Sequence, residues 1–470
     1  MKFTRVFNNR FTVNVCRLAV ALTFVFSGFV KAVDPKGTQY KIIDYLAALD
    51  LHTLVPPLAA LLASVLLSAF EFCVGVFLLF AIHRRMTSRL AFLMMLVMTP
   101  LTLWLAIDNP VKDCGCFGDA LVLTNWQTFA KNLVLLACAT VLVRWPLQMV
   151  RFISRTNQWI VINFTALFIL AISAWSLYDL PMFDFRPYHV GANIPKGMEM
   201  PANAKQPKFE TTFVLEKNGV RKEFTLENYP DSTWTFIDSK TVQVETGYVP
   251  PIHDFSLLSI DTGEDITDQV IHHQGYTFLL VSPHLEDASD NDFGVLDQLY
   301  EYCQEHNYPF YCLTASGEEA MQRWRDLTGA EYPFCQTDET TLKTIIRSNP
   351  GLLLLKNGTI IRKWSHNHLP QIEPADSSAP LEKLAIGHMP TVTVAEKIIN
   401  LLVWFVLPLF LLTLADRLWA WTQWIRRKTK KQATKKNDAA APAATEATEK
   451  ETTQSKKTIK EQQPFKEKEK

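Results

Sequence analysis

Two cysteines separated by a single glycine are the residues of this chain best suited to chemistry. Cys114 and Cys116 stand in the string Lys-Asp-Cys-Gly-Cys-Phe-Gly-Asp, which covers residues 112–119. A disulfide between them closes a small strained ring, and strain raises the reduction potential, so the bond suits exchange rather than structural bracing. Gly115 and Gly118 supply the backbone freedom that so tight a turn needs. The bare Cys-x-Cys pattern is weak, so a redox role and ordinary packing both stay open.

One carboxylic acid lies in the middle of an apolar run, which makes it the second chemical candidate. Glu71 is the single charged residue of Val55–Ile82, and a carboxyl group in hydrocarbon is costly unless it is neutral or partnered. Arg17, in the preceding apolar run, is the partner that we expect. A structural Arg17–Glu71 ion pair and a proton relay beside a thiol or quinone site are the two interpretations, and the sequence leaves both open.

Apolar runs that could form membrane-spanning helices surround these residues, since one crossing takes about 20 helical residues. They are Phe11–Val30, Val55–Ile82, Leu90–Ile107, Leu133–Val143, Trp159–Leu177 and Ile398–Ala415. The fourth run is long enough only if it includes Thr128–Asn132 or tilts in the membrane. The average composition, 48% hydrophobic and 20% charged, hides this concentration of apolar residues.

Basic residues that flank the runs give the orientation that we expect. With six crossings, one side receives most of them: Lys2, Arg5, Arg10, Arg84, Arg85, Arg89, Arg144, Arg151, Arg155, Arg426, Arg427 and Lys428. We therefore predict a multi-pass protein of the cell inner (cytoplasmic) membrane, with both termini cytoplasmic and residues 181–394 periplasmic. The formal net charge of +0 gives no basic field that would indicate nucleic acid as a partner.

Residues 181–394 have the mixed composition of a folded domain. In 181–269, Pro and Gly alternate with short strand-like stretches, which predicts a β-rich lead-in. In 270–394, strands and helices alternate, which favours an α/β domain with a largely parallel central sheet. The predicted strands are Tyr276–Val281, Pro309–Thr314, Tyr332–Gln336, Leu352–Leu355 and Thr359–Trp364, and the predicted helices are Val295–Gln304, Glu318–Leu327 and Thr341–Arg347.

That order of elements resembles the thioredoxin-like fold over residues 270–370. Asn349 and Pro350 stand where that family has a cis-proline before an edge strand, so we expect a cis peptide bond and a groove that docks an extended client chain. Where the family carries Trp-Cys-x-x-Cys, this chain has Ser282–Glu286 without a cysteine. The resemblance therefore implies a domain that does not exchange dithiols alone.

The remaining thiols of this domain are Cys303, Cys312 and Cys335. Buried packing is the favoured interpretation, and a structural disulfide among them is the alternative. His366 and His368 alternate in a segment without nearby thiols or carboxylates, so we predict a surface loop and no metal site.

The first 150 residues resemble the DoxX-like superfamily, and Cys114–Gly118 resembles the matching element of its methylamine-utilisation MauE branch. The segment from Arg17 to Lys31 is similar to the first helix of that superfamily, and Glu71 falls where relatives place an intramembrane acidic residue. The resemblance implies a four-helix membrane module linked to disulfide formation or electron transfer, with a quinone as the candidate cofactor.

The sequence thus predicts an α-helical membrane bundle plus an α/β thioredoxin-like extracytoplasmic domain. The expected parts are a DoxX/MauE-like four-helix module (1–150), a fifth transmembrane helix (151–180), the β-rich lead-in (181–269), the thioredoxin-like domain (270–394), a sixth transmembrane helix (395–420) and a disordered charged cytoplasmic tail (421–470). The tail is predicted to be disordered because it has too little apolar surface to offset its ordering entropy.

The function that this organisation favours is thiol–disulfide redox chemistry or electron transfer at the outer face of the membrane through Cys114 and Cys116. The chain would then be a thiol-disulfide oxidoreductase. The alternative is a membrane-anchored client-binding or assembly factor that uses a redox-inactive domain. The expected partners are the lipid bilayer and, according to the function, a quinone or a periplasmic protein client. A transporter has little support, because no pair of runs shows the Gly/Pro-broken symmetry of inverted repeats.

Overall fold

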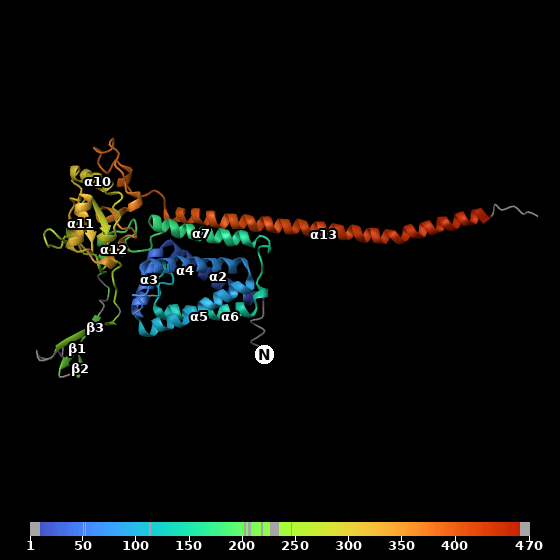
Figure 1. Ribbon diagram of the computed structural model, residues 1–470, viewed down its shortest axis with the longest axis horizontal. Coiled ribbons are helices and arrows are strands. Elements are labelled where there is room, and N and C mark those ends of the chain that lie inside the picture. Colours follow the sequence, from blue (N-terminus) through green and yellow to red (C-terminus); the bar gives the residue numbers. More distant parts are fainter. Residues whose placement is uncertain are drawn as a thin grey trace, which may run out of the picture.

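The computed structural model of this chain has a helical bundle with a sheet domain at one end. It describes residues 10–49, 51, 53–111, 114–201, 204, 208–217, 220–225, 235–245 and 247–460. Figure 1 shows the bundle helices lying side by side, with the sheet domain at one end and the first described residues of the chain at the other. The long helix α13 runs beside α7 and projects past the N-terminal end of the bundle (Figure 1).

Within the described residues, six helices are long and apolar enough to cross a membrane. They are α2 (Arg10–Val33), α4 (Pro57–Phe80), α5 (Arg84–Asp108), α6 (Asn125–Arg144), α7 (Gln158–Tyr178) and the first part of α13 (Val394–Lys460). Each coincides with one of the predicted apolar runs, so the number of spanning helices expected from the sequence is confirmed.

The start of α6 explains how the shortest apolar run becomes a full spanning helix. The Gln127 N–H donates to Thr124 Oγ1 at 3.3 Å, and the Thr124 N–H donates to Gln127 Oε1 at 3.1 Å. This capping box satisfies two N–H groups at the helix end. The helix therefore begins at Asn125, and it includes the polar turn Thr128–Asn132.

A helix that the sequence analysis missed follows α2 directly. In α3 (Pro35–Ala48), Asp34 is the N-cap and accepts a hydrogen bond from the Gly37 N–H at 2.9 Å, and Pro35 occupies the first turn. Proline is favoured there because its missing N–H has no helical partner to lose. The helix is too polar to appear as an apolar run, which is why it was not predicted.

Helices α2 and α4 approach closely because glycines lie between them. A Cβ atom on Gly28 would lie 2.4 Å from the Phe72 backbone nitrogen, and one on Gly75 would lie 2.7 Å from that of Val25. Small residues of this kind let helix backbones pack tightly in a membrane, where van der Waals contact drives association. The crossing brings the middle of α4 against the last turns of α2.

The sheet domain contains six strands in the order β4-β7-β6-β5-β8-β9. The strands are β4 (Leu258–Ser259), β5 (Tyr276–Ser282), β6 (Phe310–Thr314), β7 (Phe334–Gln336), β8 (Gly351–Lys356) and β9 (Thr359–Ser365). The main helices beside them are α10 (Phe293–Glu305), α11 (Glu318–Thr328) and α12 (Glu339–Ile345). Short helical turns are α8 (Ile194–Met198), α9 (Thr267–Ile271), η1 (Gly118–Ala120), η2 (Pro146–Gln148), η4 (Leu285–Asp287), η5 (His366–His368) and η6 (Ala385–Gly387).

The prediction of a largely parallel sheet was wrong. Only β5, β6 and β7 pair in parallel, while β4, β8 and β9 join antiparallel. The hairpin makes β9 antiparallel to β8, because a tight turn can only join antiparallel strands, and β8 itself enters the sheet antiparallel to β5. The expected edge position of β8 was also wrong, since β9 covers its outer side.

Both faces of the sheet are covered by apolar residues. Along β5, Phe278 and Leu280 pack in one core, while Leu279 and Val281 pack in another. Successive side chains of a strand point to opposite faces. A strand that is apolar at every position is therefore buried on both sides, which accounts for the continuous apolar run in the sequence.

The lead-in contains a second sheet of its own. Strands β1 (Lys208–Lys217), β2 (Val220–Thr225) and β3 (Thr235–Glu245) form an antiparallel sheet in the order β2-β1-β3. Figure 1 shows it standing apart from the six-stranded sheet. Strands therefore occur where the sequence predicts a β-rich segment.

The prediction of a disordered tail at 421–470 differs from the structure. Helix α13 continues to Lys460, and residues 461–470 lie outside the described part of the chain. The tail is rich in Ala, Lys, Glu and Gln, all of which have high helix propensity. The tail has little apolar surface, which is why disorder was predicted. A helix that packs against no core depends instead on the helix propensity of its own residues, and that propensity is high here.

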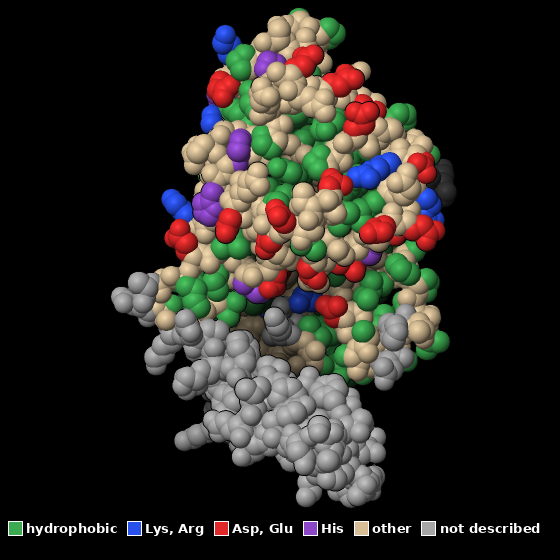
Figure 2. All heavy atoms as spheres, turned by 90° about the vertical axis from the view of Figure 1, so that its left-hand side faces the viewer, with side chains coloured by type: hydrophobic (Ala, Val, Ile, Leu, Met, Phe, Trp, Pro, Cys, Tyr) green, Lys and Arg blue, Asp and Glu red, His purple; other side chains and the backbone are tan. Residues whose placement is uncertain are grey.

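The face of the sheet domain that points away from the bundle is of mixed charge. Figure 2 shows acidic side chains spread across this face, with basic and histidine side chains among them. The opposite end of the bundle has another composition, because residues 1–33, 72–107 and 120–178 contain neither Asp nor Glu.

Candidate functional site

The two cysteines lie in the loop between α5 and α6, at the end of the bundle that carries the sheet domain. Gly115 and Gly118 both have positive φ, +61° and +51°, and the Gly118 N–H donates to the Gly115 carbonyl at 3.1 Å. Such backbone angles are costly for any residue with a Cβ atom. The glycines therefore allow the tight turn that the sequence predicts. Residues 112 and 113 of the motif lie outside the described residues.

The turn brings the two sulfur atoms together. Cys114 Sγ and Cys116 Sγ lie 2.8 Å apart, and the residues are only 7% and 9% exposed. Ser27 Oγ donates a 2.5 Å hydrogen bond to the Cys116 carbonyl, and the Tyr45 hydroxyl donates to the Cys114 carbonyl. Helices α2 and α3 thus hold the backbone of both cysteines, so the pair is fixed before any reaction.

The surroundings of the pair favour a thiolate on Cys116. The hydrogen bond from the Cys114 thiol lowers the pKa of Cys116 to about 7, against the opposing effect of burial. Lys131 and Lys31 lower the pKa further. The same hydrogen bond and burial raise the pKa of Cys114. Because the thiolate is the nucleophile in disulfide exchange, Cys116 is the better attacking group.

An aromatic ring lies between Lys131 and the end of α2. The Lys131 ammonium is 4.1 Å from the centre of the Phe117 ring, and that ring packs against Phe26 at 5.4 Å. A cation over an aromatic face is stabilised by the quadrupole of the ring. The contact keeps a positive charge beside the cysteines.

The buried acid of α4 pairs with a lysine, not with the predicted arginine. Lys31 Nζ lies 2.6 Å from Glu71 Oε2, and both side chains are buried. Arg17 instead donates to the Val150 carbonyl at 2.6 Å, and its guanidinium lies 5.3 Å from the centre of the Phe152 ring. The predicted Arg17–Glu71 pair was therefore wrong, because Arg17 lies near the opposite end of α2.

Lys31 is the main residue beside the cysteines that the sequence did not predict. The predicted apolar run ends at Val30, whereas α2 includes Lys31 and continues to Val33. Residues four apart share one helix face, so Ser27, which contacts the cysteine loop, predicts the same direction for Lys31. The Ser27 contact is itself made only by the fold, so no local pattern in the sequence marks Lys31. The same holds for Tyr45 and Lys131, since only the fold brings them to the cysteines.

Charged contacts join the sheet domain to the bundle beside this loop. Arg347, at the end of α12, lies 2.9 Å from Asp34 Oδ2 and 3.8 Å from Asp119 Oδ2, and Lys36 donates to the Arg347 carbonyl at 2.9 Å. Burial alone would raise the pKa of Asp34, but Arg347 and Arg186 more than offset it and hold that pKa below its usual range. The contact therefore favours an ionised Asp34.

A cavity of about 990 Å³ lies between the cysteine loop and the sheet domain. Gly115 and Gly118 line its bundle side, and His284 and Arg347 line its sheet-domain side. We call it the interdomain cavity. It is within the size range of small-molecule sites in proteins. A reactant that enters this cavity reaches the loop that carries the cysteines.

The Asn349–Pro350 peptide bond is cis, as the sequence predicts. Pro350 is buried, and the Asn349 carbonyl accepts a 3.1 Å hydrogen bond from the Ser289 N–H. The Asn349 side chain donates to the His284 carbonyl at 2.7 Å and accepts from Ser282 Oγ at 2.7 Å. The polar groups of Asn349 are therefore hydrogen-bonded within the sheet domain itself.

The cysteines of the sheet domain lie apart from the site. Cys303, Cys312 and Cys335 are free and buried, so the favoured packing interpretation is confirmed and a disulfide among them is not formed. His366 Nδ1 lies 2.9 Å from Ser348 Oγ, and His368 Nδ1 lies 3.3 Å from Asp179 Oδ2. Across the residues that the structure describes, no three His, Cys, Asp or Glu side chains are grouped to hold a metal ion.

These features define a multi-pass helical membrane protein with a mixed α/β domain between its last two spanning helices. A family model described as Methylamine utilisation protein MauE matches residues 9–144, which confirms the predicted resemblance of this part to MauE. A second model, described as Domain of unknown function (DUF8463), matches residues 209–246. Comparisons with curated proteins and with solved structures find no match. Cys114, Cys116 and Glu71 all lie within the MauE match.

Proposed function

We propose that this membrane protein carries out thiol–disulfide redox chemistry through Cys114 and Cys116. The observation that carries the proposal is the 2.8 Å separation of two buried sulfur atoms in a glycine turn beside the membrane bundle. Oxidation of the pair forms one S–S bond and releases two electrons and two protons. The acceptor must take up two electrons, which a quinone or a disulfide of another protein does.

Cys116 is the attacking group in this proposal, and Cys114 is the resolving group. The lowered pKa of Cys116 supports this order, since a pKa near ambient pH suits an attacking thiol. Lys31 and Lys131 stabilise the thiolate. Glu71 is held by Lys31 on the adjacent helix, so it is placed to receive a proton passed from the cysteines through that ion pair.

The membrane orientation in this proposal puts the cysteine loop and residues 181–394 on the periplasmic side of the inner membrane. The basic residues at the other end of the bundle support it by the positive-inside rule. Both the start of α2 and the projecting part of α13 lie at that basic end (Figure 1), so both termini are cytoplasmic in this orientation.

The sheet domain is, in this proposal, a thioredoxin-like unit that has lost its own dithiol. The β5 strand leads to Ser282–Glu286, the segment that stands where the family has its Trp-Cys-x-x-Cys motif, and Asn349 of the cis bond is hydrogen-bonded to Ser282 and His284 of that segment. His284 lines the interdomain cavity. The domain therefore presents this end of its sheet to Cys114 and Cys116, and it shapes the access route to them.

A client-binding factor without redox chemistry is the second candidate. The cis bond at Pro350 favours it, because that feature accompanies peptide grooves in the thioredoxin-like fold. The buried proline and the internal hydrogen bond of the Asn349 carbonyl weaken it, since strand addition needs free main-chain groups. The redox proposal needs only the two adjacent thiols of Cys114 and Cys116, which the fold already brings together.

A redox titration of the full-length protein in detergent tests the proposal. The protein is equilibrated with thiol buffers of graded potential, or with a soluble quinone, and its free thiols are tagged with a mass label. We expect Cys114 and Cys116 to change together as one two-electron couple, while the C114A/C116A variant shows no change. If Cys114 and Cys116 remain free thiols, and are therefore still labelled, under every oxidant, the proposal is overturned.

A further inference from the structure

The opposite end of the bundle contains a cavity that the redox proposal does not use. It has a volume of about 420 Å³ and lies between the start of α5 and the turn after α6. We call it the basic cavity. Its lining includes Arg85, Arg89 and Arg144. It lies at the end of the bundle away from the cysteines, so it does not belong to the site described above.

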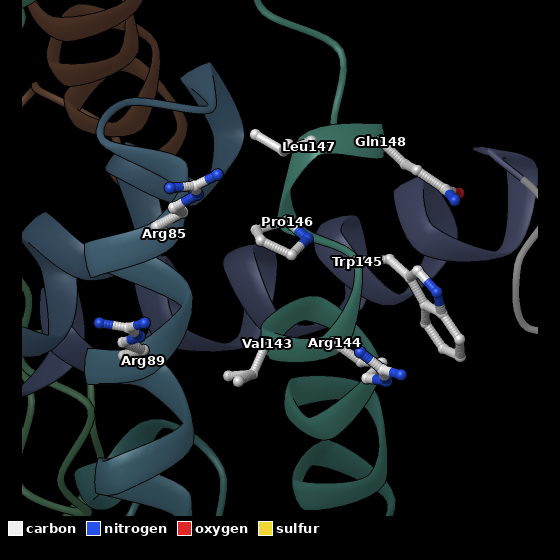
Figure 3. A pocket seen from close by; sticks show the side chains of 8 residues that line it. All are labelled: Arg85, Arg89, Val143, Arg144, Trp145, Pro146, Leu147 and Gln148. Atoms are coloured by element: carbon white, nitrogen blue, oxygen red, sulfur yellow. The ribbon is translucent and has the colours of Figure 1, made fainter.

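The two walls of the basic cavity differ in chemistry. Figure 3 shows Arg85 and Arg89 one above the other on α5, while Val143, Pro146 and Leu147 project toward them from the other wall. Residues four apart share one face of a helix, so the two guanidinium groups lie on the same side of α5. One wall is thus cationic and the other apolar.

The charge of these arginines is not compensated by acidic residues of the neighbouring helices. Residues 72–107 and 120–178, which include all of α6 and α7 and α5 up to Ile107, contain neither Asp nor Glu. Asp416 of α13 lies at this end, but its carboxylate accepts hydrogen bonds from Ser154 and Asn157. Arg85, Arg89 and Arg144 are exposed. A local excess of positive charge at the end of spanning helices attracts anionic lipid headgroups.

A neighbouring arginine stabilises the apolar wall. Arg84 Nη1 donates to the carbonyls of Leu147 and Met149, both at 2.8 Å. These bonds tie the turn after α6 to the start of α5, so the cavity is fixed by the fold. Arg84 is occupied by this structural role, whereas Arg85 and Arg89 present their guanidinium groups to the cavity (Figure 3).

We propose that the basic cavity binds an anionic phospholipid, with its phosphate on Arg85 and Arg89 and its glycerol and acyl portion against Val143, Pro146 and Leu147. Guanidinium groups bind phosphate through paired, charge-assisted hydrogen bonds. The apolar wall can contact the glycerol and acyl portion of a lipid, whereas free phosphate has no apolar group to place against it. The position at a helix end, where headgroups lie, supports a lipid as the occupant.

Native mass spectrometry of the full-length protein tests the proposal. Wild type, R85Q/R89Q, the charge-preserving R85K/R89K and the control R426Q/R427Q are titrated with phosphatidylglycerol and with phosphatidylcholine. The control removes two basic residues from the exposed surface of α13, outside the cavity. We expect wild type to prefer phosphatidylglycerol. Each arginine near an anionic headgroup contributes about fivefold, so R85Q/R89Q should bind it about 25-fold more weakly.

The other variants show whether the effect comes from this cavity. R85K/R89K should keep most of the affinity, and R426Q/R427Q should bind as wild type does. Equal binding of both lipids by wild type, or equal losses in R85Q/R89Q and the control, would overturn the proposal. Competition by inorganic phosphate as effective as by the lipid would overturn the assignment to a lipid. Redox titration of Cys114 and Cys116 in R85Q/R89Q gives an independent check that the variant is folded.

Discussion

The cysteines of the bundle and those of the sheet domain share one side-chain chemistry but have opposite environments. Cys114 and Cys116 are adjacent, lie beside Lys31 and Lys131, and occupy a glycine turn next to the interdomain cavity. Cys303, Cys312 and Cys335 are separate and lie in the cores on either face of the sheet. Burial raises the pKa of each of these three thiols, that of Cys335 to about 12.

This difference shows that burial alone does not decide what a cysteine does. All five residues are buried, yet only the bundle pair has a hydrogen-bonded partner thiol and nearby cations to offset the cost of a thiolate. In the sheet domain nothing of that strength opposes desolvation, so the thiols behave as small apolar side chains. The redox proposal therefore rests on the cysteines of the bundle, and the sheet domain contributes one wall of the interdomain cavity.

The largest expected effect is on alkylation rates. Because the pKa of Cys116 is lowered from that of an ordinary thiol and that of Cys335 is raised to about 12, the thiolate fractions at neutral pH differ by at least roughly 10³-fold. We expect a small alkylating reagent to modify Cys116 with a rate that rises as pH increases through about 7, while Cys335 stays unmodified. Peptide mass spectrometry of timed samples gives both rates.

Unfolding in urea is the control for this measurement, because it should make the two thiols react at similar rates. If the native Cys116 rate instead rises only above pH 9, where an ordinary thiol ionises, the stabilising environment inferred for it does not exist. The comparison between the two groups of cysteines would then lose its basis.

The second effect concerns ion pairs in the two regions. Glu71→Gln leaves the Lys31 charge buried without its partner, and breaking a buried pair in this way costs about 3–5 kcal/mol. In the sheet domain, Glu339→Gln removes the more exposed contact with Lys343 and should change the unfolding free energy by less than about 1 kcal/mol. Thermal unfolding in detergent measures both.

A double variant separates structure from proton transfer. Lys31→Met with Glu71→Leu removes both charges, so much of the lost stability should return, since apolar residues often replace buried pairs well. Because Lys31 also stabilises the thiolate of Cys116, the rates are compared at a pH where Cys116 is ionised in both proteins. If Glu71 relays protons, the folded double variant should still oxidise slowly there, and normal oxidation rates would assign the pair no part in proton transfer.

How much the sequence predicted depended on whether a feature is local. The spanning helices were found because each is a continuous apolar run, and β5 and β8 because each is a short, mostly apolar run, whereas the two-residue strand β4 was not predicted. The Cys-Gly-Cys turn was found for the same reason, since its chemistry lies in adjacent residues. The cis bond at Pro350 followed from the recognised order of elements.

What the sequence did not predict depends on contacts between distant segments. The partner of Glu71 was misassigned because the glycine-mediated crossing of α2 and α4 decides which turn of α2 lies opposite it. The contact of Arg347 with Asp34 joins residues far apart in the chain, and no local pattern marks it. The antiparallel direction of β8 was missed because it depends on the long-range pairing of β8 with β5, which no local pattern marks.

The smallest expected effect concerns the contact between the two regions themselves. Arg347→Gln removes the charged contacts with Asp34 and Asp119, so the sheet domain should stay closed over the cysteine loop less of the time. We expect a bulky maleimide to reach Cys116 about tenfold faster, as the loss of about 1.4 kcal/mol would give. Arg325→Gln, which loosens a 3.8 Å contact with Asp261 within the sheet domain, is the matched control and should leave the rate unchanged.

The pH dependence of this protection tests the cause. Arg347 holds the pKa of Asp34 below its usual range in the closed state, so the contact stabilises closure fully above the ordinary aspartate pKa of about 3.9. That stabilisation is lost as pH falls through the lowered pKa, because the carboxyl group must then be protonated. Protection is the ratio of the maleimide rate at Cys116 in Arg347→Gln to the rate in wild type, so the ionisation of Cys116 itself cancels. This ratio should therefore stay constant from neutral pH down to about 5 and fall only near 4 and below. A loss of protection between pH 7 and 5 in wild type would show that another group controls closure. The Arg347–Asp34 contact would then be present in the closed state without being what stabilises it.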